Sequence, residues 1–184
     1  MARWVAATLI FLAFTLPAGV LADQKDPRLD RLFERLRATE SPAESEVIEA
    51  RIWEIWGEST DRQANLLMAR GSAALDRREL RVALAAFDEL VKQAPDFAEA
   101  WNKRAIIYYL LGRMDESVRD VQRTLTLEPR HFGALSGLGV IYMGLDNDAL
   151  AIKAFEAALK LHPNIEGARA NLETLARRQG RRNI

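Results

Sequence analysis

The residues with the clearest potential for chemistry lie in one short stretch, EPRHFGALSGLG, at positions 128–139. It contains His131, one of only two histidines in the chain, together with Gly133, Gly137 and Gly139. Histidine titrates near neutral pH and can act as a base or a metal ligand. Glycine-rich loops can hold phosphate groups. The stretch could therefore form a catalytic, metal-binding or phosphate-binding centre.

The spacing of these residues does not fit the motifs of such centres. The glycines read G-x-x-x-G-x-G, whereas a dinucleotide-binding loop reads G-x-G-x-x-G. The chain has no Walker-type phosphate loop, no H-E-x-x-H and no G-x-S-x-G. It also has no cysteine that could act as a nucleophile, form a disulfide or bind zinc. We therefore expect a protein that is not an enzyme and that holds no metal and no cofactor.

Composition argues against general binding of nucleic acids. The 184 residues include 26 Lys and Arg and 26 Asp and Glu, which gives a formal net charge of zero. Proteins that bind nucleic acids without a dedicated motif carry a strong basic excess. We therefore expect a partner other than a nucleic acid.

The first 22 residues have the pattern of a signal peptide. Arg3 precedes an uncharged apolar run that ends before Pro17, and Val20 and Ala22 stand at the spacing that a signal peptidase reads. The run is shorter than the roughly 20 residues needed to cross a bilayer. We expect cleavage after Ala22, export to the periplasm, and no stable membrane anchor after cleavage.

A period of 34 residues organises the rest of the chain. Segment 98–129 aligns without a gap with segment 132–163, and segment 64–95 keeps the same register. The repeated positions include a small residue in the first half and a proline at the end. The prolines are Pro95, Pro129 and Pro163. Proline cannot continue a helix, so each unit should end there.

This pattern resembles the tetratricopeptide repeat, a 34-residue helix–turn–helix unit with the signature W-x2-L-G-x2-Y, then A-x3-F, then P. One hairpin cannot bury its apolar stripe alone, so the units must stack. The resemblance implies an all-α fold, a right-handed superhelical solenoid of such repeats. The expected segments are an N-terminal helical part with a degenerate repeat (23–63), repeats at 64–97, 98–131 and 132–165, and a cap helix with a basic tail (166–184).

The N-terminal part contains one strongly apolar helix side. Ile48, Ile52, Ile55 and Trp56 share this side, and Trp53 widens it. Two interpretations remain open at this point. The helix either packs against the repeats and caps the solenoid, or it presents a docking surface to a partner.

In proteins that the chain resembles, the first helices of successive repeats line a concave groove that holds an extended peptide or a partner helix. Carried onto the matching positions, the resemblance predicts a partner-binding groove of Asn102, Lys103, Ile106, Tyr109, Gly133, Ser136, Gly137 and Met143. The basic pairs that bind a terminal carboxylate in chaperone-binding relatives are missing. Ala69, Gly133 and Gly137 stand at several of those positions.

The repeat alignment also reinterprets the opening stretch. His131 aligns with Phe97 and Ile165, so we expect it to pack between repeats. Gly133 and Gly137 each cost roughly 1 kcal/mol relative to alanine inside a helix, which indicates that another group approaches the backbone closely there.

The sequence as a whole predicts a non-catalytic periplasmic scaffold that binds a protein or an extended peptide, with an envelope assembly factor as the role that the resemblance suggests. Short exported repeat proteins of Gram-negative bacteria are the members it resembles. The alternative is a small-ligand or metal-dependent protein centred on Gly133, Gly137 and His131.

Overall fold

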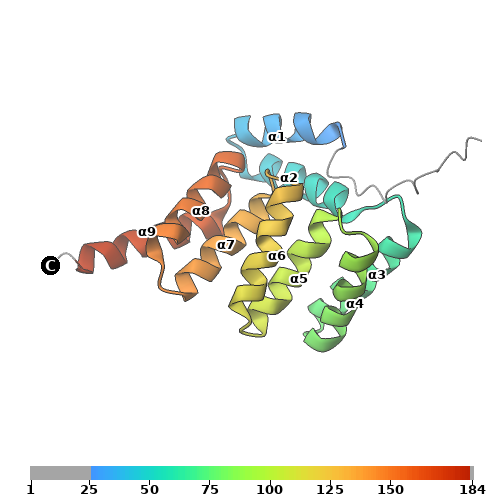
Figure 1. Ribbon diagram of the computed structural model, residues 1–184. Helices are drawn as coiled ribbons and strands as arrows, with labels where there is room; N and C mark the ends of the chain where they lie inside the picture. Colours follow the sequence, from blue (N-terminus) through green and yellow to red (C-terminus); the bar gives the residue numbers. More distant parts are fainter. Residues whose placement is uncertain (1–25, 183–184) are drawn as a thin grey trace, which may run out of the picture.

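The computed structural model describes residues 26–182, which fold into nine α-helices (Figure 1). The expected all-α fold is thereby confirmed, while the predicted signal segment at 1–22 lies outside the described residues. The helices are α1 (Arg28–Ala38), α2 (Pro42–Gly57), α3 (Arg62–Asp76), α4 (Leu80–Gln93), α5 (Ala98–Leu110), α6 (Met114–Leu127), α7 (Phe132–Gly144), α8 (Asp148–Leu161) and α9 (Glu166–Arg182).

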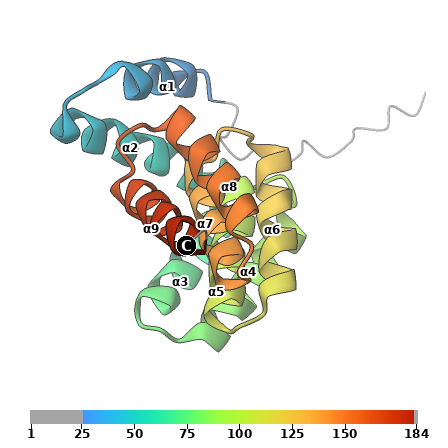
Figure 2. The same cartoon turned by 90° about the vertical axis from the view of Figure 1, so that its left-hand side faces the viewer.

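Helices α3 to α8 form three antiparallel hairpins that stack in sequence order. The closest pairs are α3 with α4, α5 with α6, and α7 with α8. Each hairpin then packs on the next through α4 and α5 and through α6 and α7, and α9 packs on α8. Figures 1 and 2 show this row of paired helices from two sides, with α9 at one end. The result is the expected helical solenoid.

Glycine allows the two helices of a hairpin to approach closely. A Cβ atom added to Gly139 would lie 2.6 Å from the ring of Phe155, and one added to Gly71 would lie 2.6 Å from the ring of Phe87. No side chain fits in that space, so the aromatic ring packs directly on the backbone of the facing helix. The contact occurs in the first and third repeats, whereas Ala105 and Val121 occupy the equivalent positions of the middle repeat.

The turn inside each hairpin also repeats in conformation. Arg78, Gly112 and Asp146 occupy equivalent positions between the two helices, and they have φ angles of 57°, 73° and 54°. A positive φ is readily adopted by glycine and is uncommon for other residues. The turns are closed locally, because the next backbone N–H donates to the carbonyl oxygen five residues earlier, from Glu79 to Ala74 and from Asn147 to Tyr142 (both 2.9 Å).

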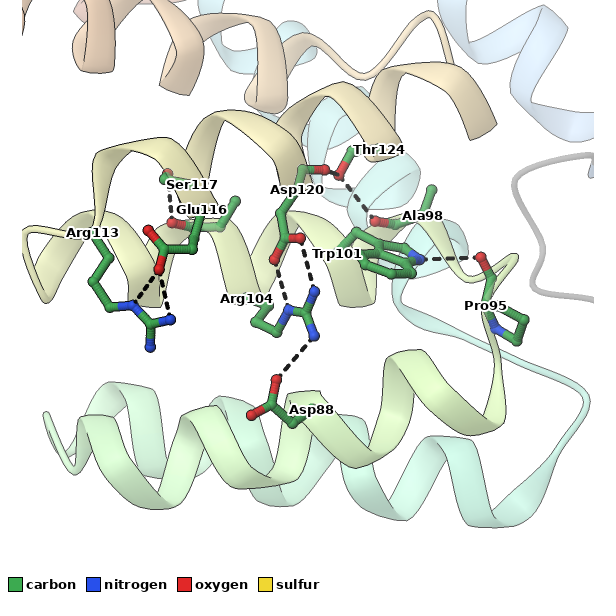
Figure 3. Close-up of polar contacts among 11 residues, drawn as sticks. Asp88, Pro95, Ala98, Trp101, Arg104, Arg113, Glu116, Ser117, Asp120 and Thr124 are labelled. Atoms are coloured by element: carbon green, nitrogen blue, oxygen red, sulfur yellow. Dashed lines mark hydrogen bonds and ion pairs between the residues drawn. The ribbon is translucent and has the colours of Figure 1, made fainter.

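Charged side chains join three successive helices along one side of α5, as Figure 3 shows. Arg104 forms a two-pronged contact with Asp120 of α6 (2.7 and 2.8 Å) and a further contact with Asp88 of α4 (2.9 Å). Partial burial disfavours the charged guanidinium, but the two carboxylates still hold the pKa of Arg104 above its usual value. Nearby, the Trp101 indole donates to the carbonyl oxygen of Pro95 (3.1 Å). Arg104 thus links two neighbouring repeats.

Helices α1 and α2, which we call the N-terminal hairpin, do not continue the stack. They lie across the ends of the repeat helices in both views (Figures 1 and 2). Contacts run from α1 to α8 and from α2 to α5. The buried cluster between hairpin and repeats consists of Leu29, Phe33, Leu36, Ile48, Ile52, Ile55, Trp56 and Phe132.

This placement decides between the two interpretations of the apolar helix side. Ile48, Ile52, Ile55 and Trp56 are each at most 1% exposed, so this side packs inward and offers no docking surface. The hairpin covers the junctions around α7 and α8 instead of the open end at α3. Leu66 of α3 is consequently 56% exposed, whereas the equivalent Ala100 and Ala134 are buried by the preceding repeat.

Candidate functional site

A cavity of about 180 Å³ opens between α5 and α7, and we call it the α5–α7 cleft. It contains five of the predicted groove residues, which are Asn102, Ile106, Tyr109, Gly133 and Gly137. The rest of the lining is Ala105, Ser117, Val121, Val140 and Ile141. The sequence-based groove and the cavity therefore overlap on the first helices of two successive repeats.

The chemistry of the cleft is mainly apolar. Ile106 is 39% exposed at its rim, and Tyr109 packs beside it, partly exposed. The hydroxyl of Ser117 already donates to the carbonyl oxygen of Ala105 (2.8 Å). Among the residues lining this cleft none is lysine, arginine or a carboxylate. It can therefore bury apolar groups of a ligand but supplies no charge to pair with one.

Three predicted groove residues lie outside the cleft lining. The ammonium group of Lys103 is 3.4 Å from the Glu99 carboxylate. Met143 packs against the cluster that includes Phe155 and Leu175, near α9. Ser136 is half-buried on α7 and does not line the cavity. The structure thus concentrates the predicted site into a smaller area than the sequence indicated.

Glu99 is a buried carboxylate at the edge of this site, and its side chain is only 2% exposed. It accepts a hydrogen bond from Asn102 (2.9 Å) and lies 2.9 Å from Nε2 of His131. The backbone N–H of Ala134 donates to Nδ1 of His131 (3.1 Å). Nδ1 is therefore the acceptor, and the proton sits on Nε2, which donates to Glu99.

This arrangement assigns a structural role to His131. Burial opposes ionisation of Glu99, but the hydrogen bond from His131 and the nearby charge of Lys103 still hold the pKa of Glu99 below its usual value. Both ring nitrogens of His131 are engaged, so neither faces a ligand. Among residues 26–182 no group of three or more His, Cys, Asp or Glu side chains is arranged to hold a metal ion. The expectation that His131 packs between repeats is met, with Glu99 as its partner.

The resemblance predicted Asn102 and Lys103 as residues of the partner-binding groove. In the structure the Asn102 amide donates a hydrogen bond to the Glu99 carboxylate, and the Lys103 ammonium forms an ion pair with it. Both residues lie on the next turn of the same helix. Residues three and four positions apart face each other on a helix, so the spacing of Glu99, Asn102 and Lys103 contained a signal for this contact. The contact between Glu99 and His131 joins residues 32 positions apart in the sequence, so no local spacing indicated it.

Gly133 and Gly137 lie one turn apart on α7 and have different surroundings. A Cβ atom added to Gly133 would lie 2.5 Å from Cη2 of Trp53. The close approach expected at this glycine is therefore made by the chain's own α2. A Cβ atom added to Gly137 would have no neighbour within 4 Å. Gly137 is open toward the cleft.

Comparison with known proteins agrees with this fold. Family models of the tetratricopeptide repeat match residues 68–126 and 132–165. A TPR repeat-containing protein of Rhizobium etli is 33% identical over 179 residues, which cover 94% of this chain and 88% of that relative. The chain belongs to the tetratricopeptide repeat (TPR) family.

Solved TPR domains have the same helical arrangement. The Sgt2 TPR domain from Aspergillus fumigatus has a TM-score of 0.63 at 22% identity, over 67% of this chain and 83% of that domain. The first TPR of Spaghetti (RPAP3), bound to the HSP90 peptide SRMEEVD, has a TM-score of 0.62 at 20% identity, over 65% of this chain and 94% of that one. At such identities the likeness concerns the fold.

The N-terminal hairpin lies before the residues that the TPR family models match. His131 at the start of α7 and His162 at the end of α8 hold the N-terminal hairpin on the stacked helices α3 to α9, which we call the TPR array. The ring of His131 stacks on Trp56 at 4.2 Å with an interplanar angle of 10°. Nε2 of His162 is 2.9 Å from the carboxylate of Glu49, which also accepts from the indole of Trp53 (3.0 Å). The hydrogen bond from His162 lowers the pKa of Glu49.

The helices of the TPR array and of the hairpin are too short or too polar to cross a bilayer. Within residues 26–182, none of them combines the length and the apolar character that a membrane span requires.

Proposed function

We propose that this TPR protein is a non-catalytic scaffold that binds a peptide segment of a protein partner in the α5–α7 cleft. The observation that carries the proposal is the open apolar cavity on the first helices of two successive repeats, where five predicted groove residues meet. A similar TPR domain, that of Spaghetti (RPAP3), is bound to a peptide. Buried apolar clefts with few polar groups are the usual form of ligand sites.

The character of the cleft defines what kind of segment it would bind. The peptide bound to the Spaghetti TPR, SRMEEVD, is acidic. In the present chain Lys103 is paired with Glu99, and the residues that line the cleft include no cation. We therefore expect recognition of apolar side chains of the partner, without a clamp for a terminal carboxylate.

A peptide-display selection against the purified mature protein tests this function. We expect peptides with dissociation constants of roughly 1–100 μM, a range that corresponds to about 5–8 kcal/mol. The Ile106→Asp variant should weaken their binding at least about tenfold, because it places a charge at the apolar rim. Leu150→Asp is the matched control, since Leu150 on α8 is 37% exposed and Ile106 is 39% exposed. Equal binding by both variants, or no selected peptide at all, would refute the cleft as the binding site.

We also propose that the protein acts in the periplasm, where it would assist assembly of envelope complexes. The support is the signal pattern at residues 1–22, with its apolar run and small residues before the cut. Segments with a positively charged start, a short apolar run and small residues at the cleavage site direct export and are then removed. The proposed partner is accordingly an envelope protein.

Expression of the full chain in a Gram-negative host tests export. We expect the protein in the periplasmic fraction with Asp23 as its first residue, measured by N-terminal sequencing. Replacing Ile10 and Phe11 by arginine in the apolar run should retain the protein in the cytoplasm with its leader attached, because charges in this region block recognition of the segment. A cytoplasmic protein that still begins near Met1 without those changes would contradict the proposal.

A further inference from the structure

Gly133 and Gly137 form a pair of bare backbone positions on one side of α7. They are four residues apart, so they lie above one another on the same helix face. Both line the α5–α7 cleft. A glycine inside a helix lowers its stability by roughly 1 kcal/mol relative to alanine. This loss is offset only if another group packs into the space that a side chain would otherwise occupy.

At Gly133 an aromatic ring of this chain uses the space. Cη2 and Cζ2 of Trp53 lie 2.5 and 2.9 Å from the position of a Cβ atom there. Trp53 is held in place by its hydrogen bond to Glu49 (3.0 Å) and by an edge contact with Phe132 at 5.4 Å between ring centroids. An indole ring resting on bare backbone is thus a contact that this surface already makes.

At Gly137 the equivalent space is open. Apart from its own helix backbone and chain neighbours, no atom lies within 4 Å of its Cβ position, and Ile106, Tyr109 and Val140 line the same cleft. The cavity measures about 180 Å³. Apolar protein cavities of about 150 Å³ bind benzene, so the space is sufficient for one aromatic ring. Gly133 borders both the Trp53 contact and the cleft, which makes the two surfaces continuous.

We propose that the cleft is a socket for one aromatic side chain of the partner, which seats on the backbone of Gly137 next to the chain's own Trp53. The inference rests on the proposed function and specifies what the bound segment must carry. The partner's ring would lie one helical turn from the Gly133 backbone on which Trp53 rests, in the cleft that Tyr109 also lines. Aromatic pairs contribute beyond their buried area, and the neutral walls favour an uncharged segment.

The direct test uses small probes with the mature protein. N-acetyl-tryptophanamide and N-acetyl-phenylalaninamide are titrated while backbone amide signals are followed by NMR. We expect saturable shifts at Gly137 and Val140 with dissociation constants on the order of 1–10 mM. N-acetyl-lysinamide should produce none of these shifts. Shifts of equal size for the lysine probe, or saturable shifts confined to other surfaces, would overturn the socket.

Gly137→Leu is the decisive variant, because it fills the socket without a clash. Its Cβ meets no neighbour and leucine is a better helix former than glycine, so the fold should be retained. Binding of the aromatic probes should fall at least tenfold. Gly144→Leu is the matched control, since its Cβ position on α7 is also open but lies outside the cleft. Should Gly137→Leu fold poorly, Gly137→Ala asks the same question with a single added carbon atom, and unchanged binding would overturn the proposal.

The display-selected peptides separate this inference from the proposed function. If peptides bind the cleft but keep full affinity when their aromatic residue is replaced by alanine, the socket is wrong while the peptide-binding function stands. If no peptide is selected but the aromatic probes bind at Gly137, the socket stands and the proposed function fails. If replacing the peptide's aromatic residue and replacing Gly137 each lower the peptide affinity, the result supports the peptide-binding function and the socket.

Discussion

Replacing Trp56 by alanine is expected to lower the free energy that holds the N-terminal hairpin on the TPR array by about 3–5 kcal/mol. Trp56 is 1% exposed and stacks on His131 at 4.2 Å. It also contacts Phe33 and Phe132 at 5.8 and 5.2 Å between ring centroids. Alanine would leave a cavity at the centre of this cluster. Amide hydrogen exchange in α2 measures the effect, because it reports the opening free energy of a local segment.

Two variants make this prediction specific. Trp56→Phe should cost about 1–2 kcal/mol at most, because a ring remains and the indole N–H, which has no hydrogen-bond partner among the described residues, is removed. Val47→Ala on the same helix should change the opening free energy by less than about 0.5 kcal/mol, since Val47 is 70% exposed. If α2 exchanges equally fast in the native protein and in Trp56→Ala, the hairpin is not held by this cluster.

The solenoid could be predicted from sequence because its information is local and periodic. The prolines after the second helices and the small residues facing Phe87 and Phe155 recur at a fixed spacing, and each repeat contacts mainly its neighbours. The same register brought five of the eight predicted groove residues into one cleft. A period specifies which helix face a residue occupies, and this was sufficient for the cleft lining.

The position of the N-terminal hairpin could not be predicted in the same way. Its contacts join residues far apart in sequence, such as Glu49 with His162 and Trp53 with Gly133. No period relates these positions, so the alignment, which extended a degenerate repeat over residues 23–63, could not indicate that this segment lies across the others. The alignment did indicate that Gly133 receives a close neighbour. It could not indicate that the neighbour is part of the same chain.

Burial altered the role of the polar residues in the groove. Asn102 and Lys103 lie on the predicted face of α5, but both contact the carboxylate of Glu99, one turn earlier on the same helix. A carboxylate with 2% exposure must be compensated by hydrogen bonds and charge. Helical geometry alone does not reveal which side chains are removed from water, and only the packed structure shows that these two are already engaged.

Replacing His131 by phenylalanine is expected to lower the free energy of unfolding by about 3–5 kcal/mol, although phenylalanine is the residue at the equivalent position 97. Phenylalanine retains a ring to stack on Trp56, but it removes the donor 2.9 Å from the Glu99 carboxylate and the Nδ1 acceptor at the start of α7. A buried charge then loses its main partner. Urea unfolding of the purified protein measures the change.

His162→Phe is the matched control within the same chain. Its Nε2 is also 2.9 Å from a glutamate, Glu49, and its Nδ1 also accepts from a backbone N–H, that of Asn164. The difference lies in the carboxylates, because the Glu49 side chain is 36% exposed and that of Glu99 is 2% exposed. Water can solvate Glu49 once its partner is lost, so we expect a loss of about 1 kcal/mol or less. Equal losses in the two variants would show that burial of the carboxylate is not the cause.

The pH dependence of stability, compared between the native protein and a Glu99 variant, tests the role of Glu99. Its pKa in the folded protein lies below the ordinary value of 4.5, despite its burial, because of His131 and Lys103. A carboxylate with a lowered folded pKa contributes stability above its unfolded pKa, and this contribution is lost as the pH falls through the folded pKa. The free energy of unfolding should therefore decline below about pH 4.5, and less steeply in Glu99→Gln.

Adding Glu99→Gln to His131→Phe should also recover part of the stability at pH 7, since the uncompensated charge is gone. Strictly additive losses in that double variant would contradict a coupled pair.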